Sequence, residues 1–198
     1  MQKLKIAITG GIGSGKSLFC HFLTDMGHIV LSADSIARTL METDEALRIK
    51  IIAQFGNDSF HGTKINKDFV SKNIFSDKNK LAFLNSIVHP AVISHSANLL
   101  NKELETRDIV FYESALIFEA GIKANFDKVV LIYSDEAIRV NRIIERDGLN
   151  SEEINKRILS QMNEDKKAEL ADIVIHNSGT KEDLRKSAAD LLKSLLNN

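Results

Sequence analysis

The chain has 198 residues, of which 43% are hydrophobic and 27% are charged, and this composition excludes the disordered, collagen-like and membrane-spanning classes. Its formal net charge of -1 provides no global field for holding a polyanion, so we expect no nucleic-acid partner. The length fits one main domain with insertions.

Cys20 is the only cysteine, which excludes an intrachain disulfide and favours a buried, inert thiol. The six histidines have no metal-ligand spacing, so we expect no zinc site. The first residues are too polar for a signal peptide, and no stretch reaches transmembrane length. We therefore expect a cytoplasmic protein without a membrane partner.

The first predicted elements are a strand, a glycine loop, a helix and a second strand. Apolar residues dominate positions 4–9, glycines break the pattern over 10–15, and helical spacing resumes over 16–26. Gly27 suits a left-handed helix cap, and residues 28–32 form the second apolar run. This βαβ order predicts a parallel sheet.

The glycine loop carries a phosphate-binding pattern, Gly10-Gly-Ile-Gly-Ser-Gly-Lys16-Ser17, between a predicted strand and a predicted helix. In this setting backbone N–H groups surround phosphate oxygens at the positive end of a helix. Lys16 then reaches the β- and γ-phosphates of ATP, and the Ser17 hydroxyl ligates Mg²⁺. A glycine turn without a ligand is the alternative, and the flanking strand and helix argue against it.

Asp34 directly follows the second predicted strand, and the carboxyl ends of strands in open α/β sheets face the ligand crevice. There its carboxylate is placed to accept or orient the proton of an attacking hydroxyl group. An N-cap role for a helix over residues 35–40 explains the same residue equally well, so both interpretations stay open.

Residues 35–104 are predicted to form a helical insertion outside the sheet and a candidate substrate lobe. Apolar residues recur with helical spacing on both sides of a polar, turn-rich stretch at 56–66, and no strand is predicted. Pro90 is the only proline, and it predicts that a helix begins just after His89.

Three further apolar runs, at residues 109–112, 129–133 and 173–175, complete a predicted sheet of five parallel strands. Glu113 ends the first of these runs in the manner of a Walker B acid. Its carboxylate either assists Mg²⁺ through water or has no special role, and the sequence leaves this open.

Three helices are predicted in the last third of the chain. Ser134 is the expected N-cap of the first, which ends at Gly148. Residues 151–169 form a heavily charged helix, and residues 181–196 form an amphipathic one.

Arg139, Arg142 and Arg146 are three and four residues apart, so they share one face of their predicted helix. Guanidinium groups suit a transferring phosphoryl group, whereas a solvated face that pairs with Glu145 or Asp147 is the plainer alternative. The charged segment that follows favours a lid that closes over the nucleotide.

Together, these motifs resemble the dephospho-CoA kinase family through nearly the whole chain. The matching segments, in order, are Thr9-Gly-Gly-Ile-Gly-Ser-Gly-Lys-Ser17, Ser32-Ala-Asp34 with Ala37-Arg38, Asn85 with Val88-His89-Pro90, Leu116-Ile-Phe-Glu119, Arg142 with Arg146-Asp147, Arg157 with Gln161, and Ala171-Asp172 through Ile175 with Asn177 and Gly179. The resemblance implies an α/β P-loop kinase fold, with a five-stranded parallel sheet flanked by helices. It implies a nucleotide-binding core at residues 1–35, 106–141 and 168–198, a helical CoA lobe at 36–105 and a helical lid at 142–167.

The resemblance also implies an activity: ATP-dependent, magnesium-assisted phosphorylation of the ribose 3′-hydroxyl of dephospho-CoA, the last step of coenzyme A synthesis. The expected partner is this small molecule, and the expected state is a monomer or weak homo-oligomer. The implied catalytic residues are Asp34, Lys16 and Arg142. The implied ATP-binding residues are Gly11, Ile12, Gly13, Ser14, Gly15, Lys16, Ser17, Leu18, Arg142, Arg146 and Asn177, with Ser17 on Mg²⁺ and Asn177 near the adenine; the implied substrate-binding residues are Thr9, Asp34, Arg38, His89 and Glu119.

The chain departs from the family pattern at four positions: Ser32 replaces Asp, Leu18 replaces Thr, Lys67 replaces Arg and Ala115 replaces Pro. These changes bear on local backbone shape more than on the reaction. A kinase for another small alcohol or nucleoside monophosphate is the alternative in the same class. A GTPase would need an aspartate where Leu104 stands, and a silent ATP-binding module would not need the full set of Lys16, Asp34 and arginines.

Overall fold

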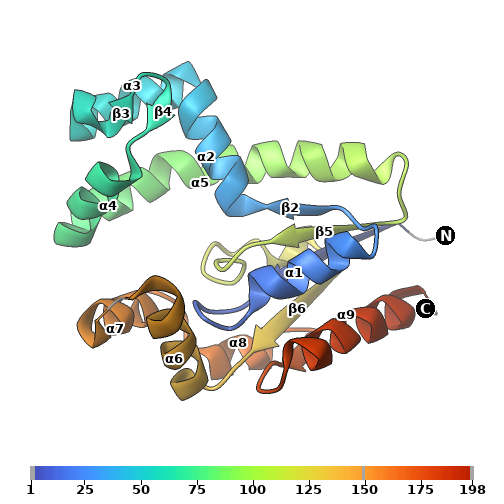
Figure 1. The fold of residues 1–198 in the computed structure, drawn as a ribbon. Helices are drawn as coiled ribbons and strands as arrows, with labels where there is room; N and C mark the ends of the chain where they lie inside the picture. The colour runs from blue at the N-terminus through green and yellow to red at the C-terminus, as the bar shows by residue number, and fades with distance from the viewer. Residues whose placement is uncertain (1–2, 149, 197–198) are drawn as a thin grey trace. The chain divides into compact units, whose positions relative to one another are not determined.

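The computed structural model describes residues 3–148 and 150–196, and the chain forms two compact units (Figure 1). Unit 1 comprises Met1–Leu31 and Lys102–Asn198, and unit 2 comprises Ser32–Asn101. Residues 1, 2, 149, 197 and 198, which fall inside the expected core and lid ranges, lie outside the described residues. Of the helices described, none combines the length and the apolar character that crossing a membrane requires.

The sheet has five strands in the order β2-β5-β1-β6-β7. They are β1 Leu4–Thr9, β2 Val30–Ser32, β5 Ile109–Glu113, β6 Lys128–Tyr133 and β7 Ile173–His176. β1 is parallel to both β5 and β6, and β6 is parallel to β7, so the carboxyl ends of these strands lie at one edge of the sheet. The predicted five-stranded α/β fold is confirmed.

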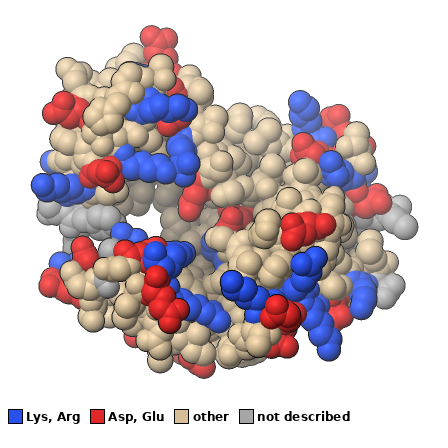
Figure 2. Space-filling model, in the orientation of Figure 1, with Lys and Arg blue, Asp and Glu red and all other residues tan. Residues whose placement is uncertain are grey.

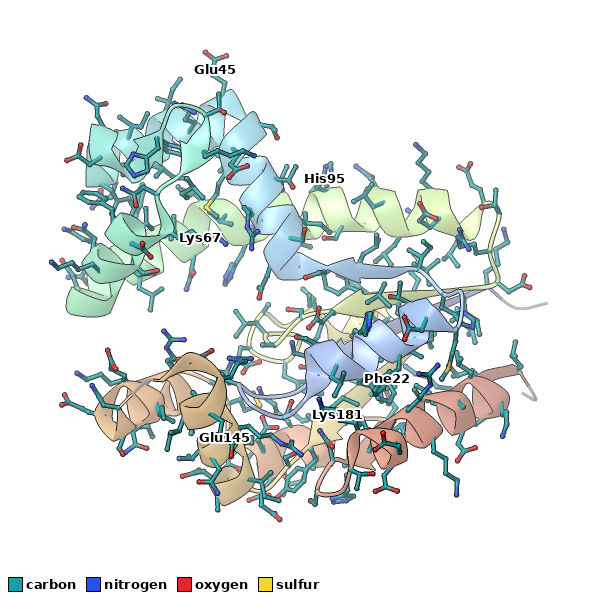
Figure 3. All side chains as sticks on the ribbon, viewed as in Figure 1. Phe22, Glu45, Lys67, His95, Glu145 and Lys181 are labelled. Carbon is teal, nitrogen blue, oxygen red and sulfur yellow. The ribbon has the colours of Figure 1, made fainter. Side chains whose placement is uncertain are left out.

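Helices cover the sheet of unit 1. The helices of unit 1 are α1 Lys16–Asp25, α6 Glu136–Asp147, α7 Ser151–Leu159, α8 Glu164–Leu170 and α9 Lys181–Leu196, with a short 3₁₀ turn, η2, at Lys123–Asn125, and not all of them lie on the sheet. α1 and α9 pack on one face, where Ile6 and Ile8 of β1 join Phe19 in one apolar cluster. Figure 3 shows Phe22 of α1 on the side that faces α9. Ala7 on the opposite face of β1 is also buried, so both faces of the sheet are covered.

The structure of unit 1 contradicts one predicted helix N-cap and one predicted helix. Asp135 rather than Ser134 is the N-cap of α6, and the Ser134 hydroxyl is buried in hydrogen bonds instead. Gly148 ends α6 with φ of 63°, as predicted. The charged helix expected over 151–169 is broken between α7 and α8, where the Asn163 side chain caps α8.

Unit 2 contains α2 Ala33–Thr43, α3 Glu45–Phe55, η1 Asn57–Ser59, β3 Phe60–His61, β4 Lys64–Ile65, α4 Lys67–Ser76 and most of α5 Lys78–Leu104. Its core centres on Ile51, Phe55 and Phe60. The expectation that this span holds no strand was wrong, because β3 and β4 pair as an antiparallel hairpin. Two-residue strands give no alternation that a sequence pattern can detect.

Pro90 lies inside α5, so the predicted helix start after His89 was wrong. An interior proline removes a backbone hydrogen bond and costs about 3 kcal/mol. Val88 and Val92 flank it and are buried, at 7% and 6% exposure. We attribute the unbroken helix to this packing, which local propensity does not register.

Candidate active site

The loop between β1 and α1 is shaped by its glycines. Gly13 and Gly15 have φ of 81° and 91°, in the left-handed region that favours glycine. A Cβ atom on Gly13 would lie 2.7 Å from the carbonyl oxygen of Arg139, so space as well as conformation requires glycine there. α1 begins directly after Gly15, which places the loop at the positive end of a helix. The loop is therefore suited to an anion such as phosphate.

Three side chains converge at the amino end of α1. The Lys16 Nζ atom lies 2.7 Å from Glu113 Oε1, and the Ser17 hydroxyl donates to the same oxygen at 2.9 Å. Ile8 of β1 is paired with Glu113 of β5, so strand register brings the acid beside the loop. Both members of the ion pair are only 14% exposed, which strengthens their interaction relative to a surface pair. Glu113 therefore contacts two P-loop residues, and its support of Mg²⁺ stays a prediction.

The oxygens at this point fit a magnesium ion. Mg²⁺ prefers hard oxygen ligands and is commonly held by one or two protein groups together with substrate phosphates. The Ser17 hydroxyl and the Glu113 carboxylate supply such oxygens 2.9 Å apart. Within residues 3–148 and 150–196, no group of three or more His, Cys, Asp or Glu could hold a metal alone. The donor set therefore suits a metal that is shared with a phosphate ligand.

Arg142 braces the P-loop from α6. Its Nη1 atom donates to Ser134 Oγ at 3.1 Å and approaches the carbonyl oxygen of Ser14 at 3.5 Å. Its Nη2 atom donates to the Asn177 carbonyl at 3.0 Å. The Asn177 side chain in turn donates to the Ser14 carbonyl at 2.7 Å, and Ser134 Oγ donates to the Asn177 carbonyl at 2.6 Å. Three residues, Ser134, Arg142 and Asn177, thus fix the Ser14 carbonyl of the loop.

The other two arginines of α6 have separate environments. Arg139 is 5% exposed, with Nη2 3.8 Å from Glu136, and it lies against Gly11. Arg146 is exposed and donates twice to Asp147, which lowers the pKa of that carboxyl group. The plainer alternative of a solvated ion pair thus describes Arg146 in this structure. Figure 2 shows Lys and Arg interspersed with Asp and Glu on the face in view.

Glu119 and Gln161 lie within unit 1, where both contact backbone N–H groups. Gln161 Oε1 accepts the N–H of Ile12 in the P-loop at 2.9 Å. Glu119 Oε1 accepts the N–H of Met162 at 2.9 Å and lies 3.2 Å from the Lys167 ammonium group. Thr9, the other unit 1 residue expected to contact substrate, is fully buried.

Asp34, Arg38 and His89 belong to unit 2. Ser32 is the N-cap of α2, and its hydroxyl accepts the Ser35 N–H at 3.5 Å, so the N-cap interpretation of Asp34 was wrong. Asp34 lies in the first turn of α2, and Arg38 lies four residues later on the same helix face. Both side chains are exposed. Partial burial lowers the pKa of His89 and so favours its neutral form.

Three of the departures from the family pattern have a local explanation. Ser32 keeps the N-cap function, which serine and aspartate share. Leu18 packs against the apolar cluster of unit 1. Ala115 contributes its carbonyl oxygen, which accepts from Lys167 at 3.3 Å, and any residue can supply that group. Lys67, labelled in Figure 3, is the first residue of α4, and nothing in the structure explains the change there.

Sequence reasoning missed two site residues, Ser134 and Lys167. Ser134 follows β6 directly, and the strand-end rule applied to Asp34 would have identified it. Lys167 had no usable signal, because a lysine in a charged helix is normally solvated whereas this one is fully buried.

The chain is similar to known proteins over nearly its whole length. A family model described as dephospho-CoA kinase matches residues 4–183. A relative from Bacteroides fragilis (strain YCH46), named dephospho-CoA kinase, is 36% identical over 178 residues, which cover 90% of this chain and 86% of the relative. A relative of the same name from Fusobacterium nucleatum is 37% identical over 187 residues, which cover 94% and 95%.

Solved structures give the same picture of the fold. A dephospho-CoA kinase from Campylobacter jejuni has a TM-score of 0.67 at 25% identity, with 97% of each chain covered. The structure of TT1252 from Thermus thermophilus has a TM-score of 0.80 at 32% identity, with 98% of this chain and 99% of that chain covered. A shikimate kinase from Acinetobacter baumannii, at 15% identity and a TM-score of 0.53 with 99% and 94% covered, shares the fold alone.

Proposed function

This chain belongs to the dephospho-CoA kinase family, and we infer that it transfers the terminal phosphoryl group of ATP to the ribose 3′-hydroxyl of dephospho-CoA, the final step of coenzyme A synthesis. The observation that carries this inference is the contact of Lys16 and Ser17 with Glu113 at the mouth of a glycine loop. A loop of this form suits the phosphates of a nucleotide.

On the donor side, the Lys16 ammonium group and P-loop N–H groups other than that of Ile12, which donates to Gln161, hold the β- and γ-phosphates. Ser17 would hold Mg²⁺, and the Glu113 carboxylate beside it would support the ion. When bound, the metal neutralises charge on the phosphate oxygens. Leu18 contributes its backbone at the start of α1, and Asn177 keeps Ser14 in place beside the adenine side of the site.

Arg142 stabilises the charge that develops on the transferring group. Its guanidinium group lies 3.5 Å from the Ser14 carbonyl, which places it beside the loop that receives the phosphates. Arg146 acts when residues 142–167 close as a lid, and it then exchanges Asp147 for a phosphate oxygen. Charge stabilisation of this kind is the main catalytic device in phosphoryl transfer.

On the acceptor side, Asp34 orients the ribose hydroxyl, and Arg38 and His89 bind the rest of dephospho-CoA through the lobe at residues 36–105. The exposed carboxylate of Asp34 at the start of α2 supports this role, because Ser32 already caps the helix. Thr9 and Glu119 stay predicted substrate contacts. Glu119 Oε1 is occupied by Met162 and Lys167, so only Oε2 is left for a substrate. The cytoplasmic location and the monomeric or weakly oligomeric state also stay predictions.

A coupled assay of ADP release tests the acceptor. Purified protein is incubated with magnesium ATP and, separately, with dephospho-CoA, AMP, shikimate or gluconate. We expect turnover with dephospho-CoA and only background with the others. Turnover with another acceptor and silence with dephospho-CoA would overturn the inference in favour of a different small-molecule kinase.

A further inference from the structure

A lysine without any solvent exposure lies on α8. The Lys167 ammonium group lies 3.2 Å from Glu119 Oε1, 3.4 Å from Glu164 Oε1 and 3.3 Å from the Ala115 carbonyl oxygen. Desolvating an ammonium group is costly unless it is paired and hydrogen-bonded. Two of its partners, Ala115 and Glu119, lie on the stretch that follows β5, and a separate path of contacts leads from each of them to the P-loop.

The first path of contacts connects Lys167 to Ile12 through Glu119, Met162 and Gln161. Glu119 Oε1, which Lys167 holds, also accepts the Met162 N–H at 2.9 Å. Met162 directly follows Gln161, whose side-chain oxygen accepts the Ile12 N–H at 2.9 Å. Fixing Met162 therefore fixes the position from which Gln161 reaches the loop.

The second path of contacts connects Lys167 to Lys16 through Ala115 and Glu113. The Ala115 carbonyl, held at 3.3 Å, lies two residues after Glu113. Glu113 contacts the Lys16 ammonium group at 2.7 Å and the Ser17 hydroxyl at 2.9 Å. The two paths, which combine hydrogen bonds, ion pairs and short stretches of backbone, thus form a circuit that starts at the buried Lys167 ammonium group and ends at the P-loop.

The same ammonium group also pairs with a buried carboxylate. Glu164 is 6% exposed, and neither of its oxygens accepts a hydrogen bond from a described residue. Lys167 is an ammonium partner of two carboxylates, the buried one of Glu164 and that of Glu119, whose side chain is 21% exposed. Removing the charge would leave Glu164 buried without this partner and lower stability whatever happens at the P-loop, so a role at the P-loop is recognised by ATP affinity and not by stability.

We propose that Lys167 is a positioning residue for the phosphoryl donor: it holds Glu119 and thereby Gln161, and so keeps the Ile12 end of the P-loop in the shape that receives the triphosphate. The proposal rests on the inference that this P-loop binds ATP. Gln161 is the second positioning residue of the same path. A preorganised loop binds its ligand more tightly because less ordering remains to be done on binding.

Calorimetric titration with magnesium ATP, without any acceptor, tests this path. Lys167→Met removes the charge and keeps the length, and Gln161→Met removes the acceptor for Ile12. We expect each variant to weaken ATP binding about tenfold. Because the two residues act in series, the double variant should fall clearly short of the product of the single effects.

Two controls separate positioning from general damage. Leu192→Ala removes a buried side chain of α9 and lowers stability without touching the circuit, and Lys181→Met removes an exposed ammonium group, labelled in Figure 3. Both should bind ATP as the unaltered protein does. If Lys167→Met does not fold, Glu119→Gln takes its place, because glutamine can still accept from Met162 while losing the attraction to Lys167.

Folded Lys167→Met or Glu119→Gln protein with unaltered ATP affinity would overturn the proposal. Effects that multiply fully in the double variant with Gln161→Met would also overturn it, because they would show that the residues act independently. The titration contains no dephospho-CoA. Failure of the acceptor assay would therefore refute the substrate and leave this test intact.

Discussion

Glu113 is the residue that links the sheet to the P-loop. One carboxylate oxygen contacts both the Lys16 ammonium group and the Ser17 hydroxyl, at 2.7 and 2.9 Å. The oxygen therefore fixes the direction of the two side chains that a nucleotide phosphate and its metal use. The register of β5 against β1 sets the position of Glu113 beside the loop.

Replacing Glu113 by glutamine should keep the side-chain shape and remove the charge. We expect kcat to fall by about 10- to 100-fold and the magnesium concentration for half-maximal rate to rise, because a group that orients a metal ligand is weakened. Steady-state kinetics at varied magnesium concentration measure both. Glu105→Gln, at an exposed position, is the matched control. An unaltered magnesium dependence in Glu113→Gln would contradict the role.

Charge stabilisation should matter more than proton abstraction in this reaction. Phosphoryl transfer passes through a loose transition state, in which the attacking hydroxyl needs little help. We expect Lys16→Ala and Arg142→Ala to lower kcat by about 100- to 1,000-fold, and Asp34→Asn to lower it less. Steady-state kinetics of the three variants provide the ranking. Asp34→Asn as the most damaged variant would show that Asp34 acts as an essential base.

Cys20 provides a pH-dependent test of burial. Burial raises the pKa of its thiol, and the Glu113 carboxylate adds to the effect. Above pH of about 8.5 the unfolded chain loses the thiol proton while the folded chain keeps it, so the free energy of unfolding should fall as pH rises. Urea titrations at pH 8 and 9.5 should show that the free energy of unfolding falls more between these two pH values in the unaltered protein than in Cys20→Ala.

The same thiol should react slowly with Ellman's reagent in the native protein and fast in denaturant, since only the thiolate is a nucleophile. Fast reaction of the native protein, or an equal loss of stability in Cys20→Ala, would contradict the buried, protonated state.

Single residues were predictable where the chemistry is local in sequence. Lys16 and Ser17 follow the glycines directly, so their pattern alone identifies them. Ser134 contacts the Ser14 carbonyl from 120 residues away, and Lys167 reaches Ala115 across 52 residues. The position of Ser134 after β6 could have marked it as a candidate, but its partner and the contact of Lys167 arise only when strands and helices are assembled.

At the level of elements, the proline inside α5 is expected to lower stability while it serves substrate binding. Pro90 lies inside the helix next to His89, which we propose as a substrate contact. We expect Pro90→Ala to raise the free energy of unfolding by about 1–3 kcal/mol, because the lost backbone hydrogen bond is restored. Chemical denaturation measures this change.

A control on the same helix has the opposite sign. Ala97→Gly, at an exposed position of α5, should lower the free energy of unfolding by about 1 kcal/mol. If proline is retained for substrate binding, Pro90→Ala should also raise the KM for dephospho-CoA. A variant with unaltered or lower stability would show that the proline ring packs favourably in the helix.

The predicted elements succeeded or failed according to their length. The strand, glycine loop and helix over residues 4–25 were predictable, since a long apolar period changes abruptly at glycines. β3 and β4 are too short for any period. The break between α7 and α8 was hidden because the polar residues there also occur on exposed helix faces.

On the scale of the whole molecule, the proposed roles divide between the two compact units. The donor residues, from the P-loop to Arg142 and Asn177, belong to unit 1, whereas Asp34, Arg38 and His89 belong to unit 2. Substitutions in the second group should therefore alter the KM for dephospho-CoA with little effect on ATP affinity.

The most direct measurement is ³¹P NMR of the products that purified protein forms from magnesium ATP and dephospho-CoA. We predict a new phosphomonoester resonance on the ribose 3′-oxygen, formed in step with ADP. Phosphate on another oxygen, or unchanged dephospho-CoA beside folded protein that binds ATP, would contradict the activity.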